Sequence, residues 1–348
     1  MHFINSRRTK WLMLLVAVAM TVTLFAGCTG EEEEKPTLTL FDGSWGSLWL
    51  ENAIAKIIIE EGYSYPCEVI TVSSDVMNAT HPKGDLLINM EQWPQNNPEW
   101  YQGNLADGTL LELGVVLEGG PQFWCIPQWV HEEYGIDTVE DMKDHWELFP
   151  DPEDSSKGMF INCKVGWNCE RINEFKFEAY GLGEYYNIIS PGTAGAETAA
   201  MAGPQKKGDP VFGYYWAPTD LMGMFDWYIL EEPAYDADIW AKIAAKMENP
   251  DLAALTEACA YESVPLTITV HKDLLDMAPD VVTMLRNFTV GLDRCNKSLA
   301  FQMENEIDEW ETVAVWWMRE YDSHWKSWVP TSAYTEIKAF LDDFGPVP

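Results

Sequence analysis

The sequence predicts an α/β fold with two lobes, and three observations support this prediction. Short apolar runs of strand length alternate with longer segments in which apolar residues recur at helical spacing. The composition, 47% hydrophobic and 22% charged, is typical of chains that fold around ordinary cores. The length of 348 residues is sufficient for two such lobes.

Strands and helices are predicted in alternation through the first part of the chain. The strands are LTLF (38–41), CEVITV (67–72), LLIN (86–89) and PQFWCIP (121–127), with helices at 48–62 and 75–80 between them. Gly62 is suited to end the first helix, because glycine readily adopts the left-handed conformation that closes helices. PQFWCIP also marks a crossing between the lobes. Thr138 and Asp141 have the spacing of a helix start with a capping side chain.

The second part of the chain continues the same alternation. Its predicted strands are GMFIN (158–162), PVFGYYW (210–216) and VPLTITV (264–270), and the C-terminal part is predicted to be helical over 306–327 and 333–341. Ile172, Phe175 and Ala179 mark one face of a helix that Gly181 ends. We place residues 37–124 and 264–348 in the first lobe and residues 125–263 in the second.

The first 27 residues have the pattern of an export signal. A basic start with Arg7, Arg8 and Lys10 precedes an apolar run that ends in Ala26-Gly27-Cys28. Small residues directly before a cysteine resemble a bacterial lipoprotein cleavage site. We therefore expect lipidated Cys28 to anchor the chain outside the cytoplasm, with the acidic segment 28–36 as a tether. The alternatives are an uncleaved membrane anchor or a plain signal peptide.

Several functional classes are disfavoured by the composition. A formal net charge of −34 argues against a nucleic-acid partner. The six histidines are scattered without metal-ligand spacing, and neither a nucleophile elbow nor a phosphate-binding loop is present, so we expect no metal, no cofactor and no catalytic residue. Among the cysteines, Cys163 and Cys169 are predicted to form a disulfide in an oxidising compartment. Cys67, Cys125, Cys259 and Cys295 are either buried thiols or further bridges.

Three tryptophans follow predicted strands. Trp93 follows GDLLINMEQ, Trp167 follows GMFINCKVG, and Trp216 closes PVFGYYW. Open α/β sheets bind their ligands beyond the carboxyl ends of the strands, so these positions are candidates for a binding site. Trp45 and Asp42, which follow the first strand, either border the same cleft or serve in packing and capping.

Four segments of the chain resemble one family. They are NMEQWPQNN, CKVGWNCERINEFKFEAYGL, GDPVFGYYWAPTD and VPLTITVHKDLLDMAPDVVTML. These segments resemble the glycine betaine/proline betaine substrate-binding proteins of ABC importers, and the similarity runs from about Leu38 to the C-terminal helices. The resemblance implies a two-lobed periplasmic-binding-protein fold of type II, with the ligand in the cleft between the lobes.

The resemblance also implies which residues bind the ligand. Trp93, Trp167 and Trp216 match the three tryptophans of the family's cage, and Cys163 and Cys169 match its short disulfide. The backbone N–H groups of Asn168 and Cys169 match the groups that hold the ligand's carboxylate. The partners implied are a small quaternary ammonium ligand and an ABC permease with its ATPase, and we expect a monomer.

Two positions depart from the family pattern. The fourth position after Trp93 is Asn97 where the family carries His, and Asp220 stands where the family carries a second aromatic residue. Asn97 keeps a neutral hydrogen-bond donor. Asp220 either lies near the bound cation or is an exposed acid at a helix start. Both changes make the pocket less positive, which favours choline, carnitine or trimethylamine N-oxide as alternatives to glycine betaine.

Tryptophan suits such a ligand for a physical reason. A quaternary ammonium group has no N–H to donate, but an indole face attracts it with about 0.5 to 2 kcal/mol. A micromolar complex needs about 8 kcal/mol, so other contacts at the oxygen end of the ligand are required as well. Without the resemblance, two other functions stay open: a secreted carbohydrate-active enzyme, whose tryptophans stack sugars, and a binding protein used for sensing.

Overall fold

The computed structural model describes residues 35–348, and residues 37–348 form one compact unit. The predicted signal peptide (1–27), Cys28 and most of the 28–36 tether lie outside the described residues.

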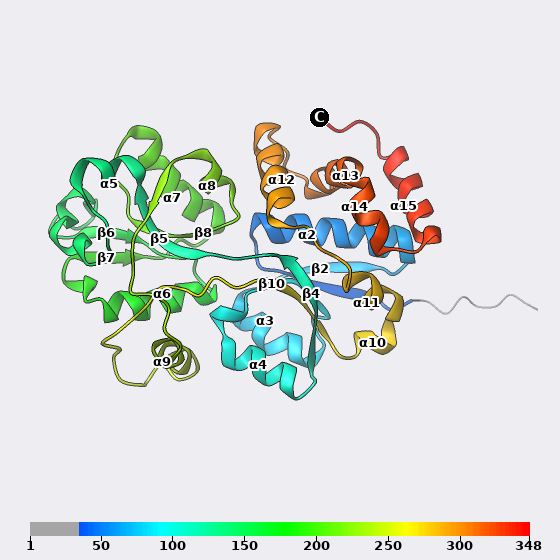
Figure 1. Ribbon diagram of the computed structural model, residues 1–348, viewed down its shortest axis with the longest axis horizontal. Helices are drawn as coiled ribbons and strands as arrows, with labels where there is room; N and C mark the ends of the chain where they lie inside the picture. Colours follow the sequence, from blue (N-terminus) through cyan, green and yellow to red (C-terminus); the bar gives the residue numbers. More distant parts are fainter. Residues whose placement is uncertain (1–34) are drawn as a thin grey trace, which may run out of the picture. The chain divides into compact units, whose positions relative to one another are not determined.

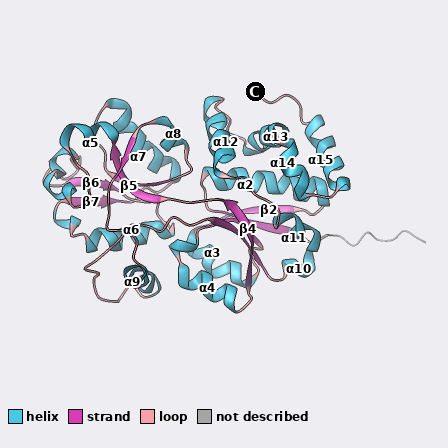
Figure 2. Ribbon diagram, viewed as in Figure 1, coloured by secondary structure: helices cyan, strands magenta, loops and turns pink. Residues whose placement is uncertain are grey.

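The strands form two five-stranded sheets, and helices pack around both (Figure 2). The first sheet has the order β2-β1-β3-β10-β4, and the second has the order β7-β6-β8-β5-β9. The strands are β1 (Leu38–Asp42), β2 (Cys67–Thr71), β3 (Ile88–Gln92), β4 (Leu110–Leu117), β5 (Gln122–Pro127), β6 (Gly158–Ile161), β7 (Tyr186–Ile189), β8 (Gly213–Trp216), β9 (Trp227–Ile229) and β10 (Leu266–His271).

Helices account for most of the remaining described chain. They are α2 (Gly46–Ile57), α3 (Ser74–Thr80), α4 (Pro98–Ala106), α5 (Gln128–Tyr134), α6 (Asn168–Ala179), α7 (Ala194–Lys207), α8 (Asp220–Met224), α9 (Ala237–Glu248), α10 (Leu274–Met277), α11 (Pro279–Leu285), α12 (Leu292–Glu304), α13 (Trp310–Glu320), α14 (Asp322–Trp325) and α15 (Thr331–Asp343). In Figure 1, α2 and the C-terminal helices α12 to α15 lie on one side of the first sheet, and α3 and α4 lie on the other.

Both sheets are mixed, and each is built around parallel strands. In the first sheet, β1 runs parallel to β2 and β3, while β10 is antiparallel to β3 and β4. In the second, β6 runs parallel to β7 and β8, while β5 is antiparallel to β8 and β9. The carboxyl ends of β1 and β3, and likewise those of β6 and β8, therefore lie at the same edge of their sheet.

The chain passes from the first sheet to the second after β4 and returns to the first at β10. The predicted crossing segment PQFWCIP contributes β5 to the second sheet. The exact lobe boundaries, 37–124 with 264–348 and 125–263, remain a prediction.

Two helices predicted from the spacing of their apolar residues are present in the structure. The helix predicted over 48–62 is α2 followed by a π-helical turn over Ile58–Gly62. The helix predicted to end at Gly181 is α6, and Gly181 has a φ of 70°. Strand β4 was not predicted, because its exposed Glu112 and its central Gly114 interrupt the apolar run.

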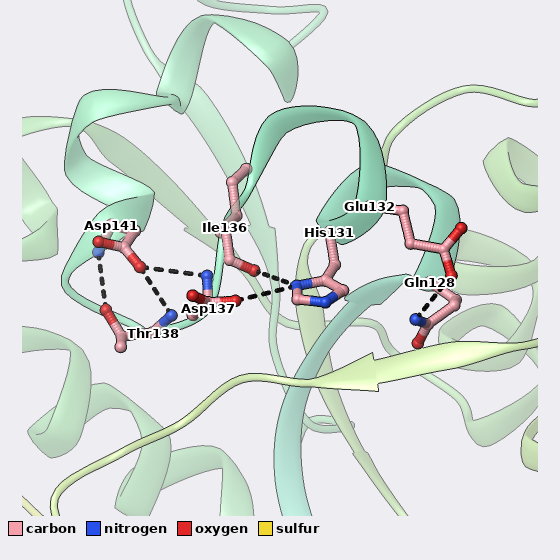
Figure 3. Close-up of polar contacts among 7 residues, drawn as sticks. All are labelled: Gln128, His131, Glu132, Ile136, Asp137, Thr138 and Asp141. Atoms are coloured by element: carbon pink, nitrogen blue, oxygen red, sulfur yellow. Dashed lines mark hydrogen bonds and ion pairs between the residues drawn. The ribbon is translucent and has the colours of Figure 1, made fainter.

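The predicted capping residues near Thr138 form their bonds, but the helix that they begin is short. Asp141 N donates to Thr138 Oγ1 at 3.2 Å, and Thr138 N donates to Asp141 Oδ2 at 2.9 Å (Figure 3). The helix is a single 3₁₀ turn, Asp141–Asp144. His131 lies beside this segment, with Nδ1 3.0 Å from Ile136 O, and its ring stacks on Tyr228.

Candidate functional site

A cavity lies where the strand-end loops of the two sheets meet. Four tryptophans line it: Trp45 after β1, Trp93 after β3, Trp167 at the start of α6, and Trp216 at the end of β8. We call these four residues the tryptophan cage. The structure thus brings the three predicted tryptophans together in one cavity and adds Trp45 as a fourth.

The first-sheet tryptophans are placed by two glycines whose missing side chains leave room for indole rings. A Cβ atom on Gly43 would lie 1.9 Å from Trp45 Cζ3, and one on Gly120 would lie 2.8 Å from Trp93 Cζ3. A larger residue at Gly43 must displace the Trp45 ring or the backbone. One at Gly120 must displace both the Trp93 ring and the side chain of Leu266, whose Cδ2 would lie 2.6 Å from the added Cβ.

Three of the four cage rings meet edge to face. The centroid of the Trp167 ring lies 5.5 Å from that of Trp45 at an interplanar angle of 89°, and 5.2 Å from that of Trp216 at 84°. This arrangement suits the quadrupoles of the rings. Trp167 is 6% exposed, and its Nε1 donates to Gly43 O at 2.7 Å. This hydrogen bond therefore links Trp167, at the start of α6, to the loop that follows β1 in the first sheet.

Further hydrogen bonds join the same two sides. Tyr214 in β8 donates to Gln122 Oε1 at 2.8 Å, and Gln122 Nε2 donates to Asn96 Oδ1 at 2.7 Å. Away from the cavity wall, Trp240 Nε1 donates to Gln95 O at 3.0 Å. These bonds hold the strand-end loops of the two sheets in contact around the cavity.

The cavity has one acidic wall residue, Glu91, the penultimate residue of β3. Its Oε1 accepts hydrogen bonds from Trp45 Nε1 at 2.8 Å and from Trp93 Nε1 at 2.9 Å. Its own N–H donates to Asn89 Oδ1 at 3.1 Å, which braces the backbone at this point. Glu91 is 1% exposed, and burial raises its pKa to about 7 against the opposing effect of its hydrogen bonds.

Another part of the cavity wall is the amino terminus of α6. Asn168 and Cys169 are the first two residues of this 12-residue helix, and both line the cavity. Trp167 is the N-cap residue and forms no side-chain cap. The N–H groups of a helix start favour an anionic or polarised oxygen. The predicted disulfide between Cys163 and Cys169 is confirmed and ties this turn to the segment after β6.

Two predicted site residues lie outside this cavity. Asn97 is the N-cap of α4, and its Oδ1 accepts from Trp100 N, because Pro98 begins a helix directly after it. The neighbouring Asn96 lines the cavity instead. Asp220 is the first residue of α8, after the N-cap Thr219, and lines two neighbouring grooves. The cage residues Trp45 and Trp216 also line one of them. The ligand-binding roles of Asn97 and Asp220 stay predictions, and neither side chain lines the cavity itself.

Sequence reasoning missed Glu91 and Tyr214, and it left Trp45 open. Trp45 carries the same signal as the other cage residues, a tryptophan just after a strand, and could have been found by it. Asp42, its neighbour, does not line the cavity. Asp42 accepts from Ser44 N, Trp49 Nε1 and Thr71 Oγ1, so it braces the turn between β1 and α2.

Within residues 35–348, the other four cysteines are free thiols, and three of them are buried. Over residues 35–348, no group of three or more histidine, cysteine or acidic side chains is arranged to hold a metal ion. None of the helices in this range is both long and apolar enough to cross a membrane.

In chemical terms, the cavity combines groups that attract a cation with N–H groups that can donate to an oxygen. Indole faces and a buried carboxyl are the groups of the first kind, and the start of α6 provides the N–H groups. This chemistry suits a small ligand with a methylated cation at one end and an oxygen at the other.

The sequence profile described as the substrate binding domain of the ABC-type glycine betaine transport system matches residues 36–320. The chain is 26% identical over 184 residues to the glycine betaine-binding periplasmic protein OusX of Dickeya dadantii, covering 52% of this chain and 53% of that protein. The match thus spans about half the length of this relative. This chain is also 22% identical over 237 residues to the trimethylamine N-oxide-binding protein of Pelagibacter ubique, and the match covers 66% of this chain and 73% of that protein.

The fold is shared with solved structures. The glycine betaine, L-proline ABC transporter binding protein ProX of Borrelia burgdorferi superposes with a TM-score of 0.68 at 17% identity, covering 86% of this chain and 99% of that one. The predicted α/β fold of the type II periplasmic binding proteins is confirmed.

Proposed function

Because this chain belongs to the family of substrate-binding domains of ABC-type glycine betaine transport systems, we propose that it captures a quaternary ammonium or other methylated-amine osmolyte in the tryptophan cage. It then delivers this ligand to an ABC permease and its ATPase. One observation carries the proposal: tryptophans from the strand ends of both sheets line a single cavity. Trp93, Trp167 and Trp216 hold the cation, with Trp45 as a fourth wall.

Cation–π attraction supplies a large part of the binding free energy. Four indole faces at about 0.5 to 2 kcal/mol each contribute about 2 to 8 kcal/mol. A micromolar complex needs about 8 kcal/mol. The oxygen end of the ligand therefore contributes as well, through the N–H groups of Asn168 and Cys169.

Glycine betaine suits both kinds of group in the cavity, with its carboxylate at the start of α6. Choline, carnitine and trimethylamine N-oxide are the alternatives, because each pairs a methylated cation with an oxygen. The name of the Pelagibacter ubique relative, a trimethylamine N-oxide-binding protein, gives that ligand additional support.

The protein acts outside the cytoplasm, as the names of its periplasmic relatives suggest. We propose that Cys28 carries the lipid that anchors it to the membrane, and that it works as a monomer. A labelled-lipid incorporation assay on the full chain tests the anchor: Cys28→Ala should abolish incorporation, and labelling that persists in this variant would contradict the assignment.

The competing function is a secreted carbohydrate-active enzyme that stacks sugars on its tryptophans. The family is one of substrate-binding domains rather than of enzymes, which favours binding without turnover. A role in sensing uses the same binding site and differs only in the partner.

Titration of intrinsic tryptophan fluorescence tests the proposal, with glycine betaine, choline, carnitine, trimethylamine N-oxide and a neutral sugar as ligands. We expect saturable changes with the methylated amines, none with the sugar, and full recovery of each ligand unaltered. A response to the sugar alone, or chemical conversion of any ligand, would replace the binding protein by the enzyme.

A further inference from the structure

The acidic side chain in the cage wall has no structural need for its charge. Glu91 Oε1 accepts both indole N–H groups, but a neutral amide oxygen would do the same. Among the described residues, its Oε2 is buried without a hydrogen-bond partner. Glu91 nevertheless lines the cavity, and no positively charged side chain of the described residues contributes to the shift of its pKa. A cation that enters the cage would therefore be the first positive charge beside this carboxyl group.

A second carboxyl group lies behind the first. Glu51 in α2 is completely buried, and both of its oxygens lack a hydrogen-bond partner within residues 35–348. Burial, and after it the charge of Glu91, raises the pKa of Glu51 well above its ordinary value. Burial therefore holds the proton on Glu51 more firmly than on an exposed glutamate, while it raises the pKa of Glu91 to about 7.

The other groups that face Glu91 do not neutralise it. From α2 come Glu51 and Ser47, from α12 comes the thiol of Cys295, and the two indoles complete the surroundings. Burial raises the pKa of the Cys295 thiol, so it stays neutral at pH 7. Lys164 stacks on Trp167 with Nζ 4.9 Å from the ring centroid, but it is not part of the cavity wall.

We propose that Glu91 is the counter-ion of the tryptophan cage and sets its preference for ligands with a net positive charge. This inference rests on the proposed function. When a methylated cation enters the cage, the proton on Glu91 passes to the solvent, and the ionised carboxylate attracts the cation. A cation such as choline gains the full attraction, while the carboxylate of glycine betaine is repelled by Glu91 and offsets part of it.

The sign of the pH dependence follows from this exchange. The cation binds the ionised form of Glu91 more tightly, so its affinity rises as the pH increases through the pKa of about 7 and levels off above it. The free protein carries a proton on about half of its Glu91 side chains at pH 7, so binding should release about half a proton there and close to one at pH 6.

Isothermal titration calorimetry of choline and glycine betaine in two buffers with different ionisation enthalpies measures the protons released. In the native protein we expect the release just described. Glu91→Gln keeps an oxygen for the two indole N–H groups but has no proton to lose. It should show no release, a pH-independent affinity, and a loss of choline affinity of about tenfold or more at pH 8, with a smaller loss for glycine betaine.

The matched control is Glu68→Gln on exposed β2, which removes one carboxylate outside the cavity and should match the native protein in both measurements. If the native protein binds methylated amines with no proton release, or if Glu91→Gln lowers both affinities equally, the role of Glu91 is refuted and the proposed function stands. If no methylated amine binds at any pH, the proposed function fails, and this inference fails with it.

Discussion

The contribution of Trp167 to binding can be worked out from its contacts. Trp167→Ala removes one indole face, which is worth about 1 to 2 kcal/mol for a desolvated cation. It also removes the hydrogen bond to Gly43 O, which is worth about 1 kcal/mol for joining the two sides of the cavity. The sum of about 2 to 3 kcal/mol predicts a loss of affinity of about 30- to 150-fold.

Isothermal titration calorimetry with glycine betaine measures this loss, and circular dichroism checks that the variant is folded. Trp167→Phe separates the two contributions, because it keeps an aromatic face and lacks the N–H; we expect a loss of about fivefold. Trp129→Ala is the control, since Trp129 lies in α5 and bonds Gln205 away from the cavity. If the Trp167→Ala protein is folded and binds glycine betaine with native affinity, the proposed role of the tryptophan cage in ligand binding is refuted.

Three further predictions concern the surroundings of the cavity. Gly120→Ala should displace the Trp93 ring and weaken glycine betaine binding about tenfold by calorimetry, while Gly103→Ala, whose Cβ meets open space, should bind normally; equal affinities would show that the ring is not confined there. Asp220→Asn should leave both the affinity and the order of ligand preference unchanged in the fluorescence titration, and a changed order would return Asp220 to the site. Replacing both Cys163 and Cys169 by Ser should lower the free energy of unfolding in urea by about 2 kcal/mol, and unaltered stability would mean that the bridge adds rigidity alone.

The sequence carried enough information to locate the cavity walls, because strands leave a local signal. The apolar run LLIN (86–89) predicted a strand at β3, although β3 itself continues through polar residues to Gln92, and β8 is an aromatic run. Trp93 directly follows β3 and Trp216 ends β8, so the geometry of the strands places both at a sheet edge. Trp167 lies in the short loop between Cys163 and Cys169 after β6, so its place near the end of that strand could also be predicted.

Side chains whose roles depend on distant partners could not be assigned. Glu91 reads as an ordinary polar residue in a strand, and its role appears only when Trp45, 46 positions earlier, donates to it. Asn97 was assigned to the ligand by its position relative to Trp93. The local preference of an asparagine before Pro98 to cap a helix decides its place instead.

Irregular elements also escaped prediction. Helix α7 contains Pro204, which reads as a helix breaker, yet the helix continues to Lys207 and ends at Gly208 with a φ of 75°. The packing of α7 on the second sheet through buried Met201 outweighs this local preference, since a methionine contact with Gly213 is possible only where β8 carries no side chain.

A crystal structure of the protein with glycine betaine tests the central claim most directly. We expect the trimethylammonium group inside the tryptophan cage, within about 6 Å of the ring centroids of Trp93, Trp167 and Trp216, with its carboxylate toward Asn168 and Cys169. A ligand bound elsewhere on the protein, or one whose methyl groups point away from the indole faces, would contradict the account.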